Sequence, residues 1–399
     1  MGKGIRIAAL VCTVVLSACG TQAPTDGPSA GKRTDTAVQG SIAPVEPVPG
    51  LRDIGLDKAT VSVETLPDAW AETKQGITAV TDRDGADVVV TQYGWDGAQR
   101  WQHTVGKPRS DDGLHPRVSV DEALGVVSVW FTTDTGTQTA IVSGDIHWFD
   151  LQDGKGDTIR PERADERSKV ESWSHLVGYT SYPDSFGPST SFTFLGPDRE
   201  PQTVQWGDLL EGEEQSWLTA VEGGVPSYSV TSPDGSVRLQ HGNTVVLEGG
   251  ASNMRWLLLP GGIYAATGIP GSELVVVDEE GTVLLDYAGE CPTSGDLAGH
   301  DGVLWAGNLM FDSRTGQSHC LDGFQDSSSS TLGLTASGIA LGESSDGMLV
   351  FSEPSYTTTR ESEVGVRLLS RGGYLLAIDD RNDERTVLSA FNADDLSLP

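Results

Sequence analysis

The stretch that decides the fold is Leu274-Val-Val-Val-Asp-Glu-Glu-Gly-Thr-Val-Leu-Leu285. An apolar run rich in valine leads into an acidic turn with a glycine, and a second apolar run follows. Runs of this length and composition are typical of β-strands. Asp and Gly favour the backbone geometry of tight turns, which a bulky residue resists. The stretch therefore predicts two strands joined by a short polar turn.

The same pattern recurs along the chain, and turns near Asp278, Asp312 and Asp346 follow at equal spacing. Further copies are Val90–Trp101, Ser227–Leu239 and Asn308–Ser318, with less regular ones at Ile146–Gly154, Phe194–Asp198 and Leu375–Asn382. Helix signals are nearly absent, and the 49 glycines are scattered in a way that suits turns. The chain is therefore predicted to be all-β.

Repeating units of roughly 40–50 residues with about four strands each indicate the blades of a β-propeller. One such unit does not bury both faces of its own sheet, so neighbouring units must stack around an axis. At that spacing, residues 58–399 would make about seven four-stranded blades. The alternative is a pair of β-sandwiches or another fold of several sheets.

The repeat resembles the quinoprotein-like (PQQ-repeat) and WD40-like β-propellers, most clearly in Phe311-Asp-Ser-Arg-Thr-Gly316. The closing tryptophan of that family is matched only at Trp101, and the Gly-His and Trp-Asp signatures of WD40 blades are missing. Quinoprotein dehydrogenases place adjacent cysteines over their cofactor, whereas Cys291 and Cys320 are far apart in this sequence. The resemblance therefore implies a propeller scaffold, and no cofactor is predicted.

The amino-terminal residues form an export signal. Lys3 and Arg6 precede an uncharged apolar run over residues 7–16, which is the order found in secretory signal peptides. That run is too short to span a bilayer as a helix, which takes about 20 apolar residues. Residues 1–18 are therefore predicted to be removed as a signal peptide, and Cys12 would leave with them.

The tetrad Leu16-Ser17-Ala18-Cys19 resembles the lipobox of bacterial lipoproteins. The resemblance implies cleavage before Cys19 and a diacylglycerol thioether on its sulfur, with palmitate-type chains. Two acyl chains suffice for stable membrane anchoring. We therefore expect a lipid-anchored protein on the extracytoplasmic face of the cell membrane; the alternative is a plain secreted protein with a chance cysteine at the cleavage site.

A tether follows the lipidated cysteine. Residues 20–50 are rich in Pro, Gly, Ser and Thr and show no apolar periodicity, which is typical of a flexible linker. We take residues 19–57 as the lipidated cysteine and linker, and residues 58–399 as the propeller domain. After cleavage only Cys291 and Cys320 accompany Cys19, and in an oxidising compartment they are predicted to form a disulfide.

The net charge excludes one class of partner. The full chain carries −31, and loss of Lys3 and Arg6 with the signal brings the mature chain to −33. Nucleic-acid-binding proteins show basic patches, so no nucleic acid is expected as a partner. Anionic lipid would not attract such a chain either, so membrane attachment depends on the acyl group. The acidic surface either keeps the protein soluble or attracts cations and basic partners.

No strong catalytic motif is present: the sequence has no His-Glu-x-x-His pair, and its Gly-x-Ser-x-Gly stretch at residues 27–31 lies in the linker and not in an elbow between a strand and a helix. Two acidic clusters, Asp153–Asp157 and Asp379–Asp383, could hold calcium, but Asp in a β-turn is the ordinary explanation. The sequence therefore assigns no catalytic, metal-binding or cofactor-binding residue. None of the histidines forms a close pair; they are His103, His115, His147, His175, His241, His300 and His319.

Two aromatic features remain. Most tryptophans lie in or beside the expected strands and should belong to the core; they include Trp95, Trp101, Trp130, Trp148 and Trp305. The polar and aromatic stretch Tyr179–Pro188 is expected to be a long loop and is the favoured binding loop, because long loops often carry function.

Two functions fit these features. The first is a monomeric, surface-anchored propeller that binds a protein, peptide or glycan without catalysis. The second is a propeller hydrolase or lyase that acts on cell-wall or extracellular polymers through carboxylates gathered near the axis. Convergent carboxylates or histidines with shifted pKa values would favour the enzyme.

Overall fold

The structure is a computed structural model that describes residues 55–396 apart from short segments. Those segments are 68, 83–84, 86, 109–113, 134–140, 161–168, 172–177, 183–190, 211–213, 251–253, 260, 294–296, 301, 322–331, 335–338, 345–346, 353–356, 363–366, 372 and 383–384. The described residues fold into antiparallel strands and two short 3-10 turns, η2 (Trp206–Asp208) and η3 (Ala393–Asp395). The predicted all-β class is confirmed.

The first half of the chain forms sheets in which strands follow each other in sequence order. The first of these sheets contains β2 (Trp70–Thr73), β3 (Gly76–Asp82), β4 (Asp87–Gly94) and β5 (Gln99–Gly106). An eight-stranded sheet follows, with β6 (Leu114–Asp121), β7 (Val126–Thr133), β8 (Ile141–Asp150), β9 (Gly156–Ile159), β10 (Lys169–Glu171), β11 (Gly178–Tyr182), β12 (Ser191–Leu195) and β13 (Pro201–Gln205).

The second half adds four-stranded sheets of the same design. They are β14 (Gln215–Glu222), β15 (Val225–Thr231), β16 (Val237–His241) and β17 (Thr244–Gly250); β18 (Arg255–Leu259), β19 (Ile263–Thr267), β20 (Leu274–Val277) and β21 (Val283–Tyr287); and β22 (Leu297–His300), β23 (Val303–Ala306), β24 (Leu309–Asp312) and β25 (Gln317–Cys320). The next is β26 (Leu332–Leu334), β27 (Ile339–Ser344), β28 (Gly347–Ser352) and β29 (Thr357–Ser362).

The last sheet joins the two ends of the domain. It contains β30 (Arg367–Arg371), β31 (Tyr374–Asn382) and β32 (Arg385–Asn392), and its fourth strand is β1 (Val61–Thr65). Val61 lies opposite Ala390 and Thr65 opposite Thr386, so the first strand completes the last sheet. This pairing ties the start of the fold to its end.

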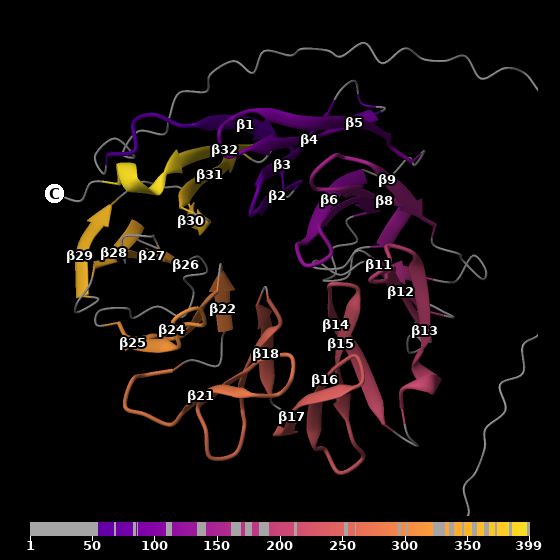
Figure 1. Cartoon of the computed structure of the whole chain (residues 1–399), viewed down its shortest axis with the longest axis vertical. Coiled ribbons are helices and arrows are strands. Elements are labelled where there is room, and N and C mark those ends of the chain that lie inside the picture. The colour runs from indigo at the N-terminus through magenta and orange to yellow at the C-terminus, as the bar shows by residue number, and fades with distance from the viewer. Residues whose placement is uncertain are drawn as a thin grey trace, which may run out of the picture. The chain divides into compact units, whose positions relative to one another are not determined.

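Successive sheets follow one another around a ring, with strands such as β2, β6, β14, β18, β22 and β30 nearest the centre (Figure 1). The innermost strands of several consecutive sheets are in contact, as with β2 and β6, β18 and β22, and β26 and β30. This is a β-propeller. About seven blades were expected, and the described strands form seven sheets, of which one is twice the usual size because β10 pairs with β8.

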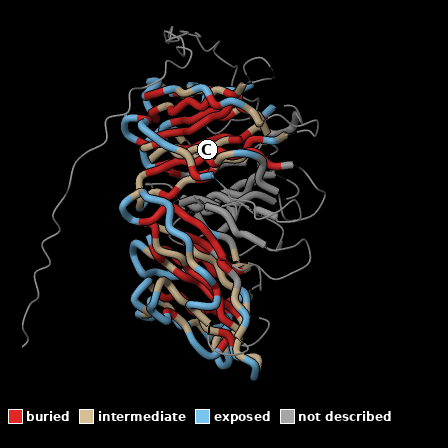
Figure 2. Tube along the Cα trace, turned by 90° about the vertical axis from the view of Figure 1, so that its right-hand side faces the viewer, coloured by how far each residue is buried: buried red, intermediate tan, exposed pale blue. Residues whose placement is uncertain are grey.

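The core lies between neighbouring sheets. Val80 and Val90 of the β2–β5 sheet pack with Val127, Val129 and Phe131 of β7 in one cluster. In Figure 2 the buried residues run along the strands, whereas the exposed ones gather at the turns. Each sheet therefore buries its faces against its neighbours, which is the reason that a single blade would not fold alone.

Candidate functional site

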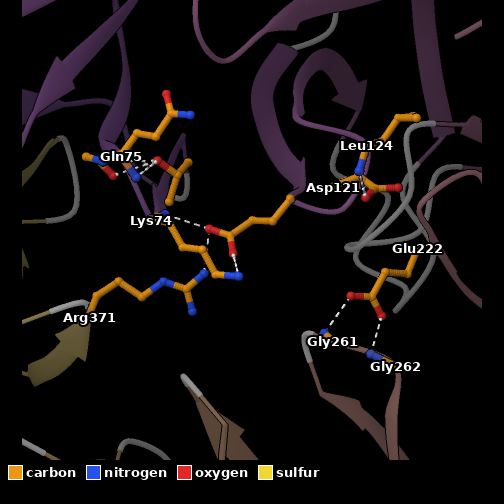
Figure 3. A network of polar contacts seen from close by, with 11 residues as sticks. Lys74, Gln75, Asp121, Leu124, Glu222, Gly261, Gly262 and Arg371 are labelled. Atoms are coloured by element: carbon orange, nitrogen blue, oxygen red, sulfur yellow. Dashed lines mark hydrogen bonds and ion pairs between the residues drawn. The ribbon is translucent and has the colours of Figure 1, made fainter. Parts of the chain in front are cut away.

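Two kinds of turn lie at the same end wherever four consecutive strands pair in order, as in β2–β5, β6–β9, β14–β17 and β18–β21. An inner turn joins the first and second strands, and an outer turn joins the third and fourth. In this end of the molecule the inner turns of different sheets are linked by buried carboxylates (Figure 3). These links form a polar network across several sheets, and we treat them as the candidate functional site.

Glu122 lies in the inner turn between β6 and β7 and contacts two other sheets. Its Oε1 accepts a hydrogen bond from the backbone N–H of Lys74 at 2.6 Å, in the inner turn between β2 and β3. The same oxygen lies 2.5 Å from Nη2 of Arg371, at the end of β30. The Arg371 side chain is only 5% exposed and that of Glu122 is 13% exposed, so this ion pair is buried. One carboxylate thus joins the last sheet, the first sheet and its own.

Asp121 precedes Glu122, and its side chain contacts a different sheet. Its Oδ1 accepts hydrogen bonds from the N–H of Leu124, at 2.9 Å, and from the N–H of Gly223, at 3.0 Å. Gly223 belongs to the inner turn between β14 and β15, which is distant in sequence. Asp121 therefore both shapes its own turn and holds a second one.

Glu222 continues the network to the next sheet. Its Oε1 and Oε2 accept hydrogen bonds from the N–H groups of Gly261, at 2.6 Å, and Gly262, at 3.0 Å, in the inner turn before β19. Gly262 has a φ of +71°, and a Cβ there would come within 2.9 Å of a Glu279 oxygen. Glycine is therefore required for the backbone to present both N–H groups to one carboxylate.

The two linking carboxylates are electrostatically unusual. Burial raises the pKa of Asp121, although hydrogen bonds from backbone N–H groups oppose the rise. Burial also raises the pKa of Glu222, and the negative charges of Asp121 and Glu279 add to the effect. Raised carboxyl pKa values are found at many acid–base sites. Here, however, the oxygens are engaged by backbone N–H groups of neighbouring turns, which is the bonding expected of a structural tie.

A hydrogen-bonded cluster of three side chains lies beside Glu222. Ser227 Oγ is 2.7 Å from Tyr264 Oη, and both hydroxyls reach His241 Nδ1, at 3.0 and 2.8 Å respectively. On the other side of the ring, His241 Nε2 faces Glu279 Oε2 at 3.7 Å. Burial lowers the pKa of His241 against the opposing charge of Glu279. Ser227 is 1% exposed, so it is placed for packing and not for attack on a substrate.

The outer turns use their carboxylates locally. Asp278 accepts hydrogen bonds from the N–H groups of Glu280 and Thr282, at 3.0 and 2.7 Å. Asp312 accepts from the N–H of Arg314, whose guanidinium returns to the same carboxylate at 2.9 Å. These are the Asp-and-Gly turns that the sequence predicted, and they fall at equivalent places in different sheets. Not every predicted turn lies there. The turn within Ser227–Leu239 joins β15 and β16, the second and third strands of their sheet, and Leu375–Asn382 lies within β31. Asp346 lies outside the described residues.

Arg199 is an unusual residue in one outer turn. Gly97 and Arg199 both donate a backbone hydrogen bond three residues back, and both have positive φ, +80° and +62°. Arg199 therefore occupies a position where glycine is favoured. Its guanidinium bonds Asp150 Oδ2 at 2.6 Å and the Leu124 carbonyl at 2.9 Å, in two other turns. These contacts offset the cost of placing a residue other than glycine in the left-handed backbone conformation.

The predicted sites have different outcomes. Cys291 and Cys320 lie at disulfide distance, with their Cα atoms 5.6 Å apart. Residues 1–54, including Cys19, lie outside the described residues. Asp153 of the first acidic cluster accepts from the Lys155 side chain at 2.6 Å, and Asp383 of the second lies outside the described residues. No group of three potential metal ligands occurs within the described part of the chain.

The prediction of a binding loop at Tyr179–Pro188 was partly wrong. Tyr179–Tyr182 belong to β11, because β10 and β12 lie on either side and pair with its backbone. The rest of Tyr179–Pro188 lies outside the described residues. The tryptophan prediction was better: Trp95, Trp101, Trp130 and Trp305 are buried. Trp148 is partly buried against the core.

Comparison with known proteins identifies no family. No family model and no curated protein matches this sequence. Among solved structures, the chain is similar to a eukaryotic initiation factor, with a TM-score of 0.42, 10% identity, and coverage of 88% of this chain and 87% of that one. It is also similar to AztD from Citrobacter koseri, with a TM-score of 0.40, 14% identity, and coverage of 77% and 90%.

A third similar structure is the WD40 β-propeller domain of Doa1, with a TM-score of 0.34, 11% identity, and coverage of 85% of this chain and 99% of that one. At these identities the likeness concerns the fold alone. No helix in the described ranges has both the length and the apolar character that crossing a membrane requires.

The sequence did not reveal the inner-turn network. Asp121, Glu122 and Glu222 stand next to ordinary turn residues and match no motif, and their partners are up to hundreds of positions away. One signal was present: adjacent acids follow directly after a strand pattern in Val118-Ser-Val-Asp-Glu122. Paired acids at the end of an apolar alternation occur at a turn, and only the fold shows which turn they face.

Proposed function

We propose that the protein is an extracytoplasmic lipoprotein, held at the cell membrane by a diacylglycerol group on Cys19, whose propeller is a non-catalytic binding module for a protein, peptide or glycan. The observation that carries the binding role is the inner-turn network. Its carboxylates tie five sheets together through backbone N–H groups and Arg371, which fixes the turns as a rigid platform. Rigid elements present binding residues at low entropic cost.

The anchor is supported by the lipobox-like tetrad Leu16-Ser17-Ala18-Cys19 after a short apolar run. The test compares the Cys19→Ala variant with a Cys12→Ala control, which removes a thiol from the signal and leaves the tetrad intact. We expect the control to enter the detergent phase with a fatty-acylated amino terminus. The Cys19→Ala variant should appear in the medium or accumulate unprocessed. Unchanged membrane retention of Cys19→Ala would overturn the anchor.

The enzyme alternative has one observation in its favour, the raised pKa values of Asp121 and Glu222. Its test is incubation of the full-length protein with peptidoglycan and with soluble polysaccharides, followed by mass spectrometry of the products. We expect no cleavage. A product that disappears in a folded Glu222→Gln variant would replace the binding role with a hydrolase or lyase.

A further inference from the structure

Exposed apolar side chains are confined to one place in the described part of the chain. Val245 is 37% exposed, Val283 57% and Leu284 37%, and these are the exposed large apolar residues among those described. Val245 lies in β17 and the other two in β21, each of which is the outermost strand of its sheet. Exposed apolar residues on strand edges favour association with another chain.

These residues form one patch because the two strands are neighbours. A Cβ placed on Gly281, in the turn that leads into β21, would come within 3.3 Å of the Val246 carbonyl and 3.5 Å of the Val245 carbonyl. The start of β21 therefore lies against β17, and Figure 1 shows both strands at the outer edge of their sheets. We call Val245, Val283 and Leu284 the β17–β21 edge.

A β-bulge explains why two consecutive residues of β21 face solvent. Val276 pairs with Leu285 and Val277 with Val283, so Leu284 is an extra residue without an opposite partner. A regular strand would have turned one of Val283 and Leu284 inward. The bulge instead leaves both exposed.

The equivalent strand of the first sheet shows what a protected edge looks like. In β5, Gln92 pairs with Trp101 and Tyr93 with Gln99, so Arg100 is the extra residue. Arg100 and Leu284 each lie three residues after a left-handed glycine, Gly97 and Gly281. Arg100 carries a charge and binds Asp96 at 2.9 Å. Charges and bulges are the usual protection of outer strands, and the bulged position of β21 carries an apolar leucine in place of a charge.

The surroundings of the edge are strongly acidic. Between Arg238 and Arg314 the sequence contains one Lys or Arg, namely Arg255, against ten Asp or Glu. Glu248 is exposed on β17, Asp286 on β21 and Glu280 in the turn between β20 and β21. An apolar centre with an acidic rim is complementary to an apolar segment with basic flanks.

We propose that the β17–β21 edge is the docking surface for a segment of a partner protein that carries apolar side chains flanked by Lys or Arg. The inference rests on the proposed function, because it names the surface and the partner chemistry of the binding module. The apolar residues supply burial, and the acidic rim selects basic partners and speeds their approach.

The test titrates the full-length protein, purified in detergent, with a synthetic heptapeptide of alternating lysine and leucine. Leu284→Arg copies the residue found at the equivalent place in β5, and Gln205→Arg adds the same charge to the exposed outer strand β13 as the matched control. Loss of a buried leucine contact is worth about 1.5–3 kcal/mol, so Kd should rise about tenfold or more in Leu284→Arg. The control should change it less than about threefold.

A second variant guards against misfolding. Val283→Thr keeps the shape of a β-branched residue, and we expect a smaller rise in Kd with an unchanged circular dichroism spectrum. The proposal is overturned if wild type does not bind, if both arginine variants bind alike, or if a lysine–serine peptide binds as tightly. A wild-type dimer in sedimentation that Leu284→Arg dissociates would instead assign the edge to a second copy. None of these results depends on Cys19, so failure here is separate from failure of the anchor.

Discussion

Glu222 and Asp278 each accept two backbone N–H bonds in turns at the same end of their sheets, but they use them differently. Asp278 binds N–H groups two and four residues along its own outer turn. Glu222 binds N–H groups about forty residues away, in the inner turn of the next sheet. The carboxylates of the outer turns therefore act within one sheet, whereas those of the inner turns hold different sheets together. The same interaction, a carboxylate that accepts hydrogen bonds from backbone N–H groups, therefore shapes single turns in one region and joins separate sheets in the other.

The strongest test of this difference is Glu122→Ala. It leaves the buried Arg371 guanidinium without its carboxylate, and breaking a buried pair in this way costs about 3–5 kcal/mol. We expect a loss of that size in the free energy of unfolding, measured by urea denaturation. The control is Lys74→Ala, whose exposed ammonium lies 3.7 Å from the same carboxylate and should contribute at most about 1 kcal/mol. Equal effects of the two variants would contradict a buried link.

The second test is Glu222→Ala, which removes the acceptor of two N–H groups between sheets. An unpaired N–H costs about 1–3 kcal/mol when it is buried, and Gly262 is buried while Gly261 is exposed. We therefore expect a loss of about 2 kcal/mol in unfolding free energy. The backbone amides of both glycines should also exchange their hydrogens faster, as measured by nuclear magnetic resonance. Faster exchange confined to the β14–β17 sheet would refute the link between the two sheets.

The matching change in an outer turn is Asp278→Ala. Its hydrogen bonds stay within one exposed turn, so about 1 kcal/mol or less should be lost. Faster exchange should be confined to residues 278–282. A stability loss as large as that of Glu222→Ala would erase the distinction between the two kinds of turn.

The smallest expected effect is a pH dependence of opposite sign in the two regions. The raised pKa of Glu222 means that its contribution to stability is greatest below its ordinary pKa, near 4, and is lost as pH rises through the raised value. In the outer turn, burial alone would raise the pKa of Asp150, but its hydrogen bond with Arg199 lowers it. Stability from Asp150 is therefore present above pH 4 and lost as pH falls through the lowered value.

Urea midpoints from pH 3 to pH 7 would measure these two signs. Glu222→Gln should flatten the decline above pH 4, and Asp150→Asn should flatten the decline below it. His241 should add a third pH dependence. Burial lowers its pKa, so its contribution to stability is full above about pH 6.5 and falls as the pH drops below that value. Changes of the reverse sign would show that the carboxylates are not bonded as described.

The outer turns could be predicted from sequence and the inner turns could not, for a physical reason. Asp278 and its partners lie within five residues, so turn chemistry alone finds them. The buried tryptophans and the cysteine pair were likewise visible, because residue type decides burial and few pairings were possible. Arg371 lies in the last sheet and Glu122 in the eight-stranded sheet, and the two meet only because the fold brings these sheets together. No local pattern encodes that contact, and no pattern predicted that Tyr179–Tyr182 would pair as a strand.

The pairing of β1 with β32 also bears on how the chain is made. Thr60 donates to the carbonyl of Ala390, 330 residues later, so the earliest strand to be synthesised has to wait for almost the latest. Until residues 385–392 emerge, β1 is an unpaired ribbon, and a product truncated by a premature stop codon would keep that ribbon exposed. Proteases and chaperones that act on newly made chains could therefore recognise an incomplete molecule by its unpaired β1.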